Sequence, residues 1–368
     1  MITRFEVKNF QGFEHLVYDF KSEKRYDFNT YLIKNKTINS SLIFGKNGSG
    51  KTILCYAIMD ITYCITGISK NVLPGINYIN ASSRNNAAYF KYNFDFDGDK
   101  VEYEYAKSSQ FIFQYEKLLI NNKLTLFRNA SNPSTNVINI KGMSSIDASS
   151  CSDLTSIITF SYLLHKFKED DVIYKLVKFV NSMLLCNFNQ ALLNTDYIPF
   201  ARTFSEKALI EKNKLSELQE FLKSFDINYQ LIPLEDYNNN VIGVRFPNGK
   251  KIPLFDVASN GTLDLIVYFY YSTFFENSSF IIIDDFDSTY QYNIAKKIYK
   301  SISSLKNVQS VLTTHNLLLL DNDYTRPDCI FYLNNNQIKP FSSLCDVNIR
   351  KNNNLLKMYL DGKFNFNF

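Results

Sequence analysis

The 368-residue sequence has few of the residues that build metal clusters or disulfide frameworks. Its six cysteines are scattered, and no two of them have C-x-x-C spacing. This pattern implies neither a zinc ribbon nor a disulfide scaffold. The N-terminus also lacks the charged segment followed by an apolar run that marks a secretory leader. We therefore expect reduced thiols and a cytoplasmic location.

Long apolar runs and a strong charge of one sign are absent as well. The longest apolar stretch, residues 263–275, is too short to span a bilayer and is followed by Glu276 and Asn277. The 40 Lys and Arg residues against 36 Asp and Glu residues leave a net charge of only +4. This near balance excludes a wholly basic surface for nucleic acid. We expect a soluble protein that makes no contact with a membrane.

Tryptophan is missing, whereas phenylalanine and tyrosine are abundant at 32 and 25 residues. Together with many Asn, Lys and Ile residues, this composition is typical of the codon use of an AT-rich genome. The aromatic content therefore does not predict stacking on nucleic-acid bases.

Against this background, residues 45–52 carry the most informative pattern in the chain. The segment G-K-N-G-S-G-K-T fits the phosphate-loop pattern G-x-x-x-x-G-K-[ST]. Its glycines let the backbone curl so that amide groups point at a phosphate, and a following helix adds the positive end of its dipole. The pattern predicts that a triphosphate-sized anion is bound by Gly45, Lys46, Asn47, Gly48, Ser49, Gly50, Lys51 and Thr52, and it does not distinguish ATP from GTP.

Two residues of the loop have more specific expected roles. Lys51 would reach the β- and γ-phosphate oxygens, and the Thr52 hydroxyl would bind Mg²⁺, which prefers oxygen ligands. A glycine-rich turn could match the pattern by chance. However, residues 41–44 read as a short strand and residues 53–59 as a helix, which is the context that a phosphate loop requires.

The second half of the chain carries acidic residues at the end of an apolar strand, F-I-I-I-D-D over residues 280–285. Such a strand is typical of the middle of a parallel sheet, whose carboxyl edge binds ligands in open α/β folds. Asp284 would hold Mg²⁺, and Asp285 would polarise the attacking water. Taken alone, an acidic pair at a strand end is a common surface feature. Its presence beside a phosphate loop favours the functional interpretation.

Two further polar segments fit the same site. His315 follows the apolar strand of residues 310–314 in the sequence S-V-L-T-T-H-N, and its position indicates a sensor of the γ-phosphate. A lone histidine is more often structural, so this prediction depends on its place at a strand end. Ser259 and Gly261 precede the apolar helix of residues 263–275 and could offer N–H groups and a hydroxyl to an anion. The alternative for this pair is an ordinary helix cap.

The remaining pattern predicts an α/β fold with a mostly parallel core sheet. Residues 87–127 alternate with period two and have turn signals at Asp97-Gly98 and Asn121-Asn122, which indicates an N-terminal antiparallel β subdomain. From about residue 153 to 225 the signal becomes helical. We expect residues 1–145 to form the first part of an ATPase head, 146–230 a helical insertion, and 231–368 the second part.

The order of these motifs resembles that of the ABC-type ATPase heads related to RecF, the SMC proteins and the OLD-family ATPases. It is most similar to OLD-like ATP-binding proteins of bacterial phage-defence and abortive-infection systems. The similarity extends to F-E-V-K-N-F at residues 5–10, R-P-D-C-I-F at 326–331 and Y-L-D-G-K-F at 359–364. The resemblance implies ATP and Mg²⁺ as ligands. It also implies a head-to-tail homodimer or higher oligomer, in which Ser259 and Gly261 contact the γ-phosphate bound by the other subunit.

Three positions depart from the family pattern. Asp285 replaces the usual catalytic glutamate and is one methylene shorter, so we expect slow hydrolysis. Gln11 stands where the family often has arginine, and Gln291 stands where it often has histidine.

Two functions from different classes follow from the resemblance. The residues after His315 carry no acidic cluster of the TOPRIM nuclease type, and no long coiled coil is encoded. The first function is therefore an ATP-gated sensor or scaffold that controls a separately encoded toxin or nuclease in anti-phage defence. The alternative is a RecF-like DNA-binding ATPase in DNA repair, with nucleic acid as the partner.

Overall fold

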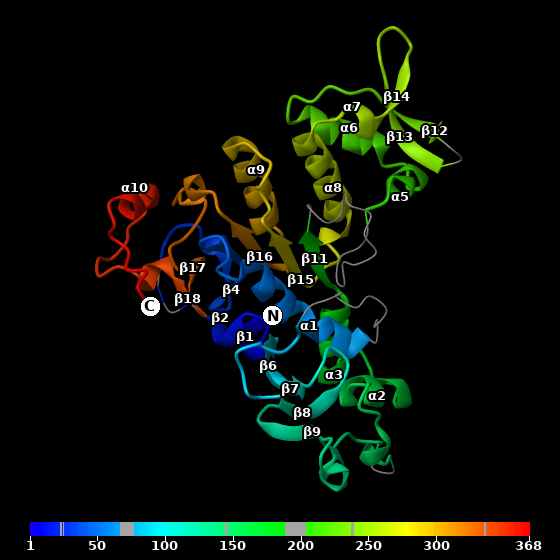
Figure 1. Cartoon of the computed structure of the whole chain (residues 1–368), viewed down its shortest axis with the longest axis vertical. Coiled ribbons are helices and arrows are strands. Elements are labelled where there is room, and N and C mark those ends of the chain that lie inside the picture. The colour runs from blue at the N-terminus through cyan, green and yellow to red at the C-terminus, as the bar shows by residue number, and fades with distance from the viewer. Residues whose placement is uncertain are drawn as a thin grey trace.

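The computed structural model describes all residues except 23, 25, 67–76, 144–145, 188–203, 237–238 and 335. Its elements form two large sheets, with a smaller sheet at one end of the molecule (Figure 1).

The first sheet is antiparallel and has the strand order β10-β9-β8-β7-β6-β1-β2. Two of its turns, Asp97-Gly98 and Asn121-Asn122, have positive φ at both residues (55° and 106°, 50° and 62°), which matches the strand twist of a tight hairpin. The strands are β1 (Ile2–Phe10), β2 (Phe13–Asp19), β6 (Ala88–Phe96), β7 (Asp99–Lys107), β8 (Phe113–Ile120), β9 (Lys123–Asn129) and β10 (Val137–Ile138).

The second sheet forms the centre of the molecule and has the order β11-β15-β16-β5-β17-β18. All neighbouring pairs are parallel except β17 with β18, so five strands end at the same edge. The strands are β5 (Ser40–Phe44), β11 (Met183–Asn187), β15 (Phe280–Asp284), β16 (Gln309–Thr314), β17 (Ile330–Asn334) and β18 (Gln337–Pro340). This common edge brings the segments after β5, β15 and β16 together.

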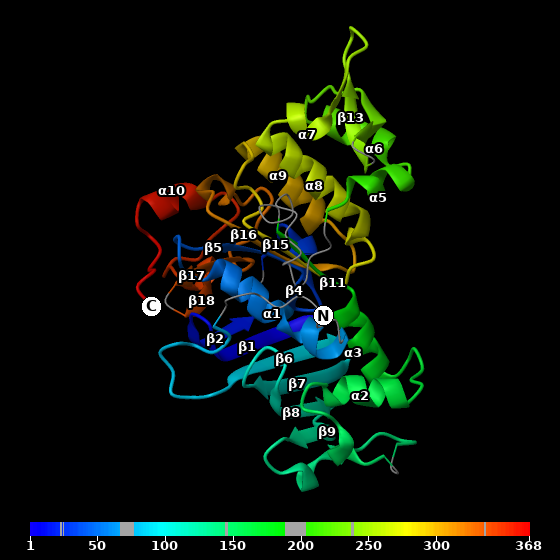
Figure 2. The same cartoon turned by 45° about the vertical axis from the view of Figure 1, so that its right-hand side comes forward.

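Helix α1 (Lys51–Thr66) lies between the two large sheets (Figure 2). Every residue from Leu54 to Ile65 is buried, as expected for a helix that is covered on all sides. Helices α2 (Ile157–Leu164) and α3 (Val172–Asn181) pack beside it. Side chains of α1 and of both sheets form one hydrophobic core.

A second core covers the opposite face of the central sheet, under α8 (Asn260–Phe275) and α9 (Tyr292–Ser303). Strand β15 shows how the two cores are separated. Its residues alternate, so that Ile282 belongs to the core with α1, and Ile281 and Ile283 belong to the core with α8. This burial on both faces explains why the strand is apolar throughout.

The small sheet β12-β13-β14 lies beside α8, at the end of the molecule farthest from β9 (Figures 1 and 2). Helix α6 docks on α8, where the Phe221 ring lies 5.8 Å from the Tyr268 ring and 5.3 Å from the Phe269 ring. The buried side chains of this helix, Leu218 and Leu222, belong to the same core. The elements here are α5 (Glu206–Glu211), α6 (Leu215–Lys223), β12 (Leu231–Asp236), β13 (Asn239–Arg245), β14 (Lys251–Pro253) and α7 (Leu254–Val257).

The remaining elements are short. They are β3 (Ile33–Lys34), β4 (Thr37–Ile38), α10 (Leu355–Leu360) and the 3-10 helices η1 (Thr30–Leu32), η2 (Pro133–Thr135), η3 (Ala148–Ser150), η4 (Leu317–Leu319) and η5 (Phe341–Ser343).

The predicted fold class is confirmed: the protein has a mostly parallel core sheet and an N-terminal antiparallel sheet. Helices α2, α3, α5 and α6 lie in the part of the chain between β10 and β12. Within the range 153–225, where the signal is helical, Met183–Asn187 instead form β11, and residues 188–203 lie outside the described residues. A short apolar run fits either state, and pairing with β15 decides it. Among the described residues, no helix is both long and apolar enough to cross a membrane.

Candidate functional site

The phosphate loop connects the end of β5 to the start of α1 at the carboxyl edge of the central sheet. Gly48 and Gly50 have φ values of 76° and 97°, in the region that favours glycine. Gly45 is confined in another way, because a Cβ atom there would lie 2.5 Å from Ser49 Oγ and 2.8 Å from the carbonyl oxygen of Leu333. Conformation or close approach thus explains all three glycines of the motif.

Lys51 is the first residue of α1, and its side chain folds back over the loop. Its Nζ donates hydrogen bonds to the carbonyl oxygens of Gly45 at 3.0 Å and of Lys46 at 3.3 Å. Burial lowers the pKa of Lys51, while Asp285 and Asp284 act in the opposite direction. The ammonium group therefore interacts with both carboxylates that follow β15.

Asp284 is joined to the phosphate loop by a direct side-chain contact. The Thr52 hydroxyl donates to Asp284 Oδ2 at 2.7 Å, across 232 positions of sequence. The Thr313 hydroxyl donates to Asp284 Oδ1 at 2.8 Å. The two predicted ligands of Mg²⁺ thus lie side by side, with a third hydroxyl from β16 fixing the carboxylate.

Asp285 and His315 follow neighbouring strand ends and interact electrostatically. Asp285 has a left-handed backbone with φ of 50°, and its N–H donates to the Thr313 hydroxyl at 2.7 Å. Burial raises the pKa of Asp285, whereas His315 and Lys51 lower it. Burial and Lys51 both lower the pKa of His315, while Asp285 and Asp284 act in the opposite direction. The site therefore holds a carboxylate with a raised pKa and an imidazole with a lowered pKa.

Ser259 and Gly261 lie at the start of α8. The Ser259 hydroxyl accepts a hydrogen bond from Thr262 N at 3.3 Å, so Ser259 caps the helix. A Cβ atom at Gly261 would lie 3.3 Å from the carbonyl oxygen of Thr289, in the segment that follows Asp285. In the part of the chain that the structure describes, neither residue makes a hydrogen bond or ion pair with the phosphate loop. The structure therefore brings together five of the predicted site residues but not this pair. The five are Lys51, Thr52, Asp284, Asp285 and His315.

The residues present fit a magnesium-bound triphosphate. The buried Ser49 hydroxyl inside the loop has no hydrogen-bond partner among the described residues. Glycine at position 45 leaves room inside the loop that a side chain would occupy. The Thr52 hydroxyl and Asp284 carboxylate supply hard oxygen ligands, which suit Mg²⁺. Lys46 and Asn47 are exposed at the tip of the loop, so they are free to contact a bound nucleotide.

Three residues of the site were not singled out from the sequence. Thr313 bridges Asp284 and Asp285, and the Thr314 hydroxyl contacts the carboxylate of Asp287. The sequence signal that could have found them is the pair of polar residues at the end of one apolar strand, together with the acidic residues at the end of another. Of the three departures from the family pattern, Asp285 lies in the site, Gln11 is in the β1–β2 turn with φ of 48°, and Gln291 precedes α9.

One family model matches part of the chain. Residues 159–321 match a family described as "AAA domain, putative AbiEii toxin, Type IV TA system". This segment contains Ser259, Gly261, Asp284, Asp285 and His315, and it excludes the phosphate loop. No similar protein is found among curated proteins.

Solved structures with similarity to the chain include the SMC head domain from Thermotoga maritima, at 15% identity and a TM-score of 0.43, covering 92% of this chain and 98% of that chain. The SMC head bound to the C-winged helix domain of ScpA has 16% identity and a TM-score of 0.43, covering 92% and 97%. The recombination mediator protein RecF in its ATPrS structure has 14% identity and a TM-score of 0.41, covering 92% and 98%.

Proposed function

We propose that this protein is an ABC-type ATPase that binds ATP and Mg²⁺ and closes as a head-to-tail dimer around the nucleotide. The observation that carries the proposal is the hydrogen bond from Thr52 to Asp284, which joins the phosphate loop to the acidic strand. The interaction of Lys51, Asp285 and His315 at the same edge gives it further support.

Each residue has a distinct role in the proposed reaction. The loop amides and Lys51 hold the β- and γ-phosphates. Thr52 and Asp284 hold Mg²⁺, which neutralises negative charge on the phosphate oxygens when it is bound. Asp285 orients a water for attack on the γ-phosphorus and accepts its proton as the bond to ADP breaks. His315 contacts the γ-phosphate. The short side chain of Asp285 makes turnover slow.

The dimer completes the site in this proposal. As the family resemblance implies, Ser259 and Gly261 contact the γ-phosphate held by the partner subunit. Their lack of a polar contact with their own phosphate loop among the described residues is consistent with this arrangement. The exposed start of α8 offers free N–H groups for this contact.

We further propose that closure of the dimer controls a separately encoded effector, a toxin or nuclease, in anti-phage defence. The family description that names the AbiEii toxin and a type IV system supports this part. The test is co-expression with the product of the adjacent gene. We expect a complex whose stability differs between ATP and ADP and which the Lys51→Ala variant does not form. A complex with the same affinity in all three conditions contradicts nucleotide control.

The ATPase itself is tested by single-turnover hydrolysis of labelled ATP with and without Mg²⁺. We expect slow, magnesium-dependent release of phosphate from the wild type. Lys51→Ala should abolish nucleotide binding, because it removes the charge that faces the phosphates. Normal ATP affinity in this variant would overturn the site assignment. Hydrolysis as fast as that of ordinary ABC ATPases would contradict the role given to Asp285.

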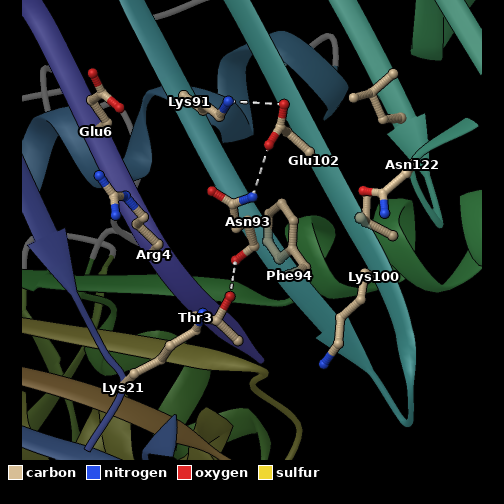
Figure 3. Close-up of a pocket in the computed structure, with 12 residues that line it drawn as sticks. Thr3, Arg4, Glu6, Lys21, Lys91, Asn93, Phe94, Lys100, Glu102 and Asn122 are labelled. Carbon is tan, nitrogen blue, oxygen red and sulfur yellow. Dashed lines mark hydrogen bonds and ion pairs between the residues drawn. The ribbon is translucent and has the colours of Figure 1, made fainter. Parts of the chain in front are cut away.

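One observation favours the alternative function, a DNA-binding ATPase of the RecF kind. Two cavities of about 510 and 810 Å³ share Thr3, Lys21 and Lys100 in their linings. In the smaller cavity, which Figure 3 shows, Lys91 pairs with Glu102. Arg4 and Lys21 have no carboxylate partner in the described part of the chain. These charges suit the phosphate backbone of a nucleic acid.

The double variant Arg4→Glu and Lys21→Glu separates the two functions. If the alternative is correct, wild-type protein binds a fluorescent DNA duplex with an affinity that falls as salt rises, and the variant loses most of that affinity. Absence of salt-dependent binding by the wild type removes the alternative. ATP binding, measured on the same preparations, should be unchanged by the two substitutions.

A further inference from the structure

The ends of β15 and β16 are joined by a second threonine–carboxylate contact, beyond the one at Asp284. The Thr314 hydroxyl lies 2.8 Å from both Oδ1 and Oδ2 of Asp287 and donates its proton to this carboxylate. The same hydroxyl accepts a hydrogen bond from Asn316 N at 2.9 Å. Thr314 is fully buried and Asp287 is 7% exposed. The Thr314 hydroxyl is therefore hydrogen-bonded within the protein both as a donor and as an acceptor.

The position of this contact links it to the proposed reaction. Asp287 lies two residues after Asp285, and Thr314 directly precedes His315. The contact thus ties the turn that carries the carboxylate to the strand end that carries the imidazole. The Asp287 carboxylate and the Thr314 hydroxyl are bonded to each other, and among the described residues neither makes a hydrogen bond to the phosphate loop.

The turn after β15 needs such a restraint. Asp285 has φ of 50°, a left-handed conformation that residues with a side chain rarely adopt. Its N–H is held by the Thr313 hydroxyl at 2.7 Å. The N–H of Phe286 donates to the Thr313 carbonyl oxygen at 3.2 Å. The contact between Asp287 and Thr314 is the next tie along the turn, and it leaves Asp285 fixed on both sides.

We propose that Asp287 and Thr314 are positioning residues, whose hydrogen bond holds Asp285 and His315 in the relative placement needed for hydrolysis. This inference rests on the proposed ATPase function. Without the bond, the turn keeps only its ties to Thr313, so Asp285 and His315 are held less firmly and water and γ-phosphate are less well oriented together. Nucleotide affinity is retained, because the phosphate loop and Lys51 lie on other elements.

The experiment compares Thr314→Val with Thr314→Ser in the full chain. Valine keeps the shape of threonine but removes the hydroxyl, and serine restores it. We expect Thr314→Val to lower kcat at least tenfold while KM for ATP stays within twofold. We expect Thr314→Ser to keep kcat within threefold of the wild type. The matched control is Thr325→Val, which removes another fully buried hydroxyl that donates to Asp321 O at 2.7 Å. Its kcat should be unchanged.

The possible failures are distinguishable. If the wild type shows no magnesium-dependent hydrolysis, the proposed function itself fails. If the wild type hydrolyses ATP and Thr314→Val retains kcat within twofold, the positioning role is wrong. A fall of kcat in Thr325→Val equal to that in Thr314→Val would assign the loss to general destabilisation. Should Thr314→Val not fold, Asp287→Ala replaces it, with the same tenfold loss of kcat expected and an unchanged kcat overturning the inference.

Discussion

The substitution Gly45→Ala adds one methyl group at the most crowded point of the phosphate loop. Its Cβ atom would lie 2.5 Å from Ser49 Oγ and 2.8 Å from the carbonyl oxygen of Leu333. The serine side chain can rotate away. The Leu333 carbonyl cannot, because it belongs to β17, which pairs with β5 on one side and β18 on the other. The loop itself must therefore move outward from β17.

The size of the effect follows from the cost of overpacking, which is typically about 1–3 kcal/mol. We expect the free loop to relax outward, so that the cost falls mainly on the closed loop that binds phosphate. Since about 1.4 kcal/mol corresponds to a tenfold change in affinity, Kd for ATP with Mg²⁺ should rise about five- to 150-fold.

The assay is a titration with a fluorescent ATP analogue, accompanied by thermal unfolding to verify that the variant folds. The control is Gly249→Ala. Gly249 has φ of 82° and no neighbouring atom within 4 Å of a Cβ, so its substitution strains the turn between β13 and β14. That variant should lose some stability and keep its ATP affinity. Wild-type Kd in Gly45→Ala, with an unchanged melting temperature, would refute the steric argument.

Three further predictions concern the acidic edge of the sheet. Asp285→Ala should bind ATP normally and accumulate as a closed dimer on size-exclusion chromatography, because hydrolysis is blocked; rapid return to monomer would contradict this. His315→Ala should lower kcat more than ATP affinity, and unchanged turnover would give this residue a structural role. Burial raises the pKa of Asp287 from 3.8 to about 6, so its contribution to stability is present below pH 3.8 and is lost as pH rises through 6. The Asp287→Asn variant does not ionise at this position and so does not lose this stability. The difference in free energy of unfolding, variant minus wild type, should therefore rise by up to about 3 kcal/mol between about pH 4 and pH 7. A difference that does not change with pH would disprove this prediction.

Local patterns in the sequence were sufficient for the elements whose conformation depends on near neighbours. The hairpins at Asp97-Gly98 and Asn121-Asn122 follow from residues that tolerate positive φ. The apolar run of β15 follows from burial on both faces of a central strand. The phosphate loop follows from glycines placed where the backbone must turn. In each case the physical cause lies within a few residues of the pattern that reveals it.

Only the tertiary structure decided which distant residues meet. Met183–Asn187 became a strand because β15 offered a partner, although the run itself fits a helix equally well. Thr52 reaches Asp284 across 232 positions because parallel strands end at one edge. Thr313 and Thr314 gained their partners in the same way, since a hydroxyl shows no preference in sequence for the carboxylate it will meet. Contacts of this kind depend on strand order, which no local pattern contains.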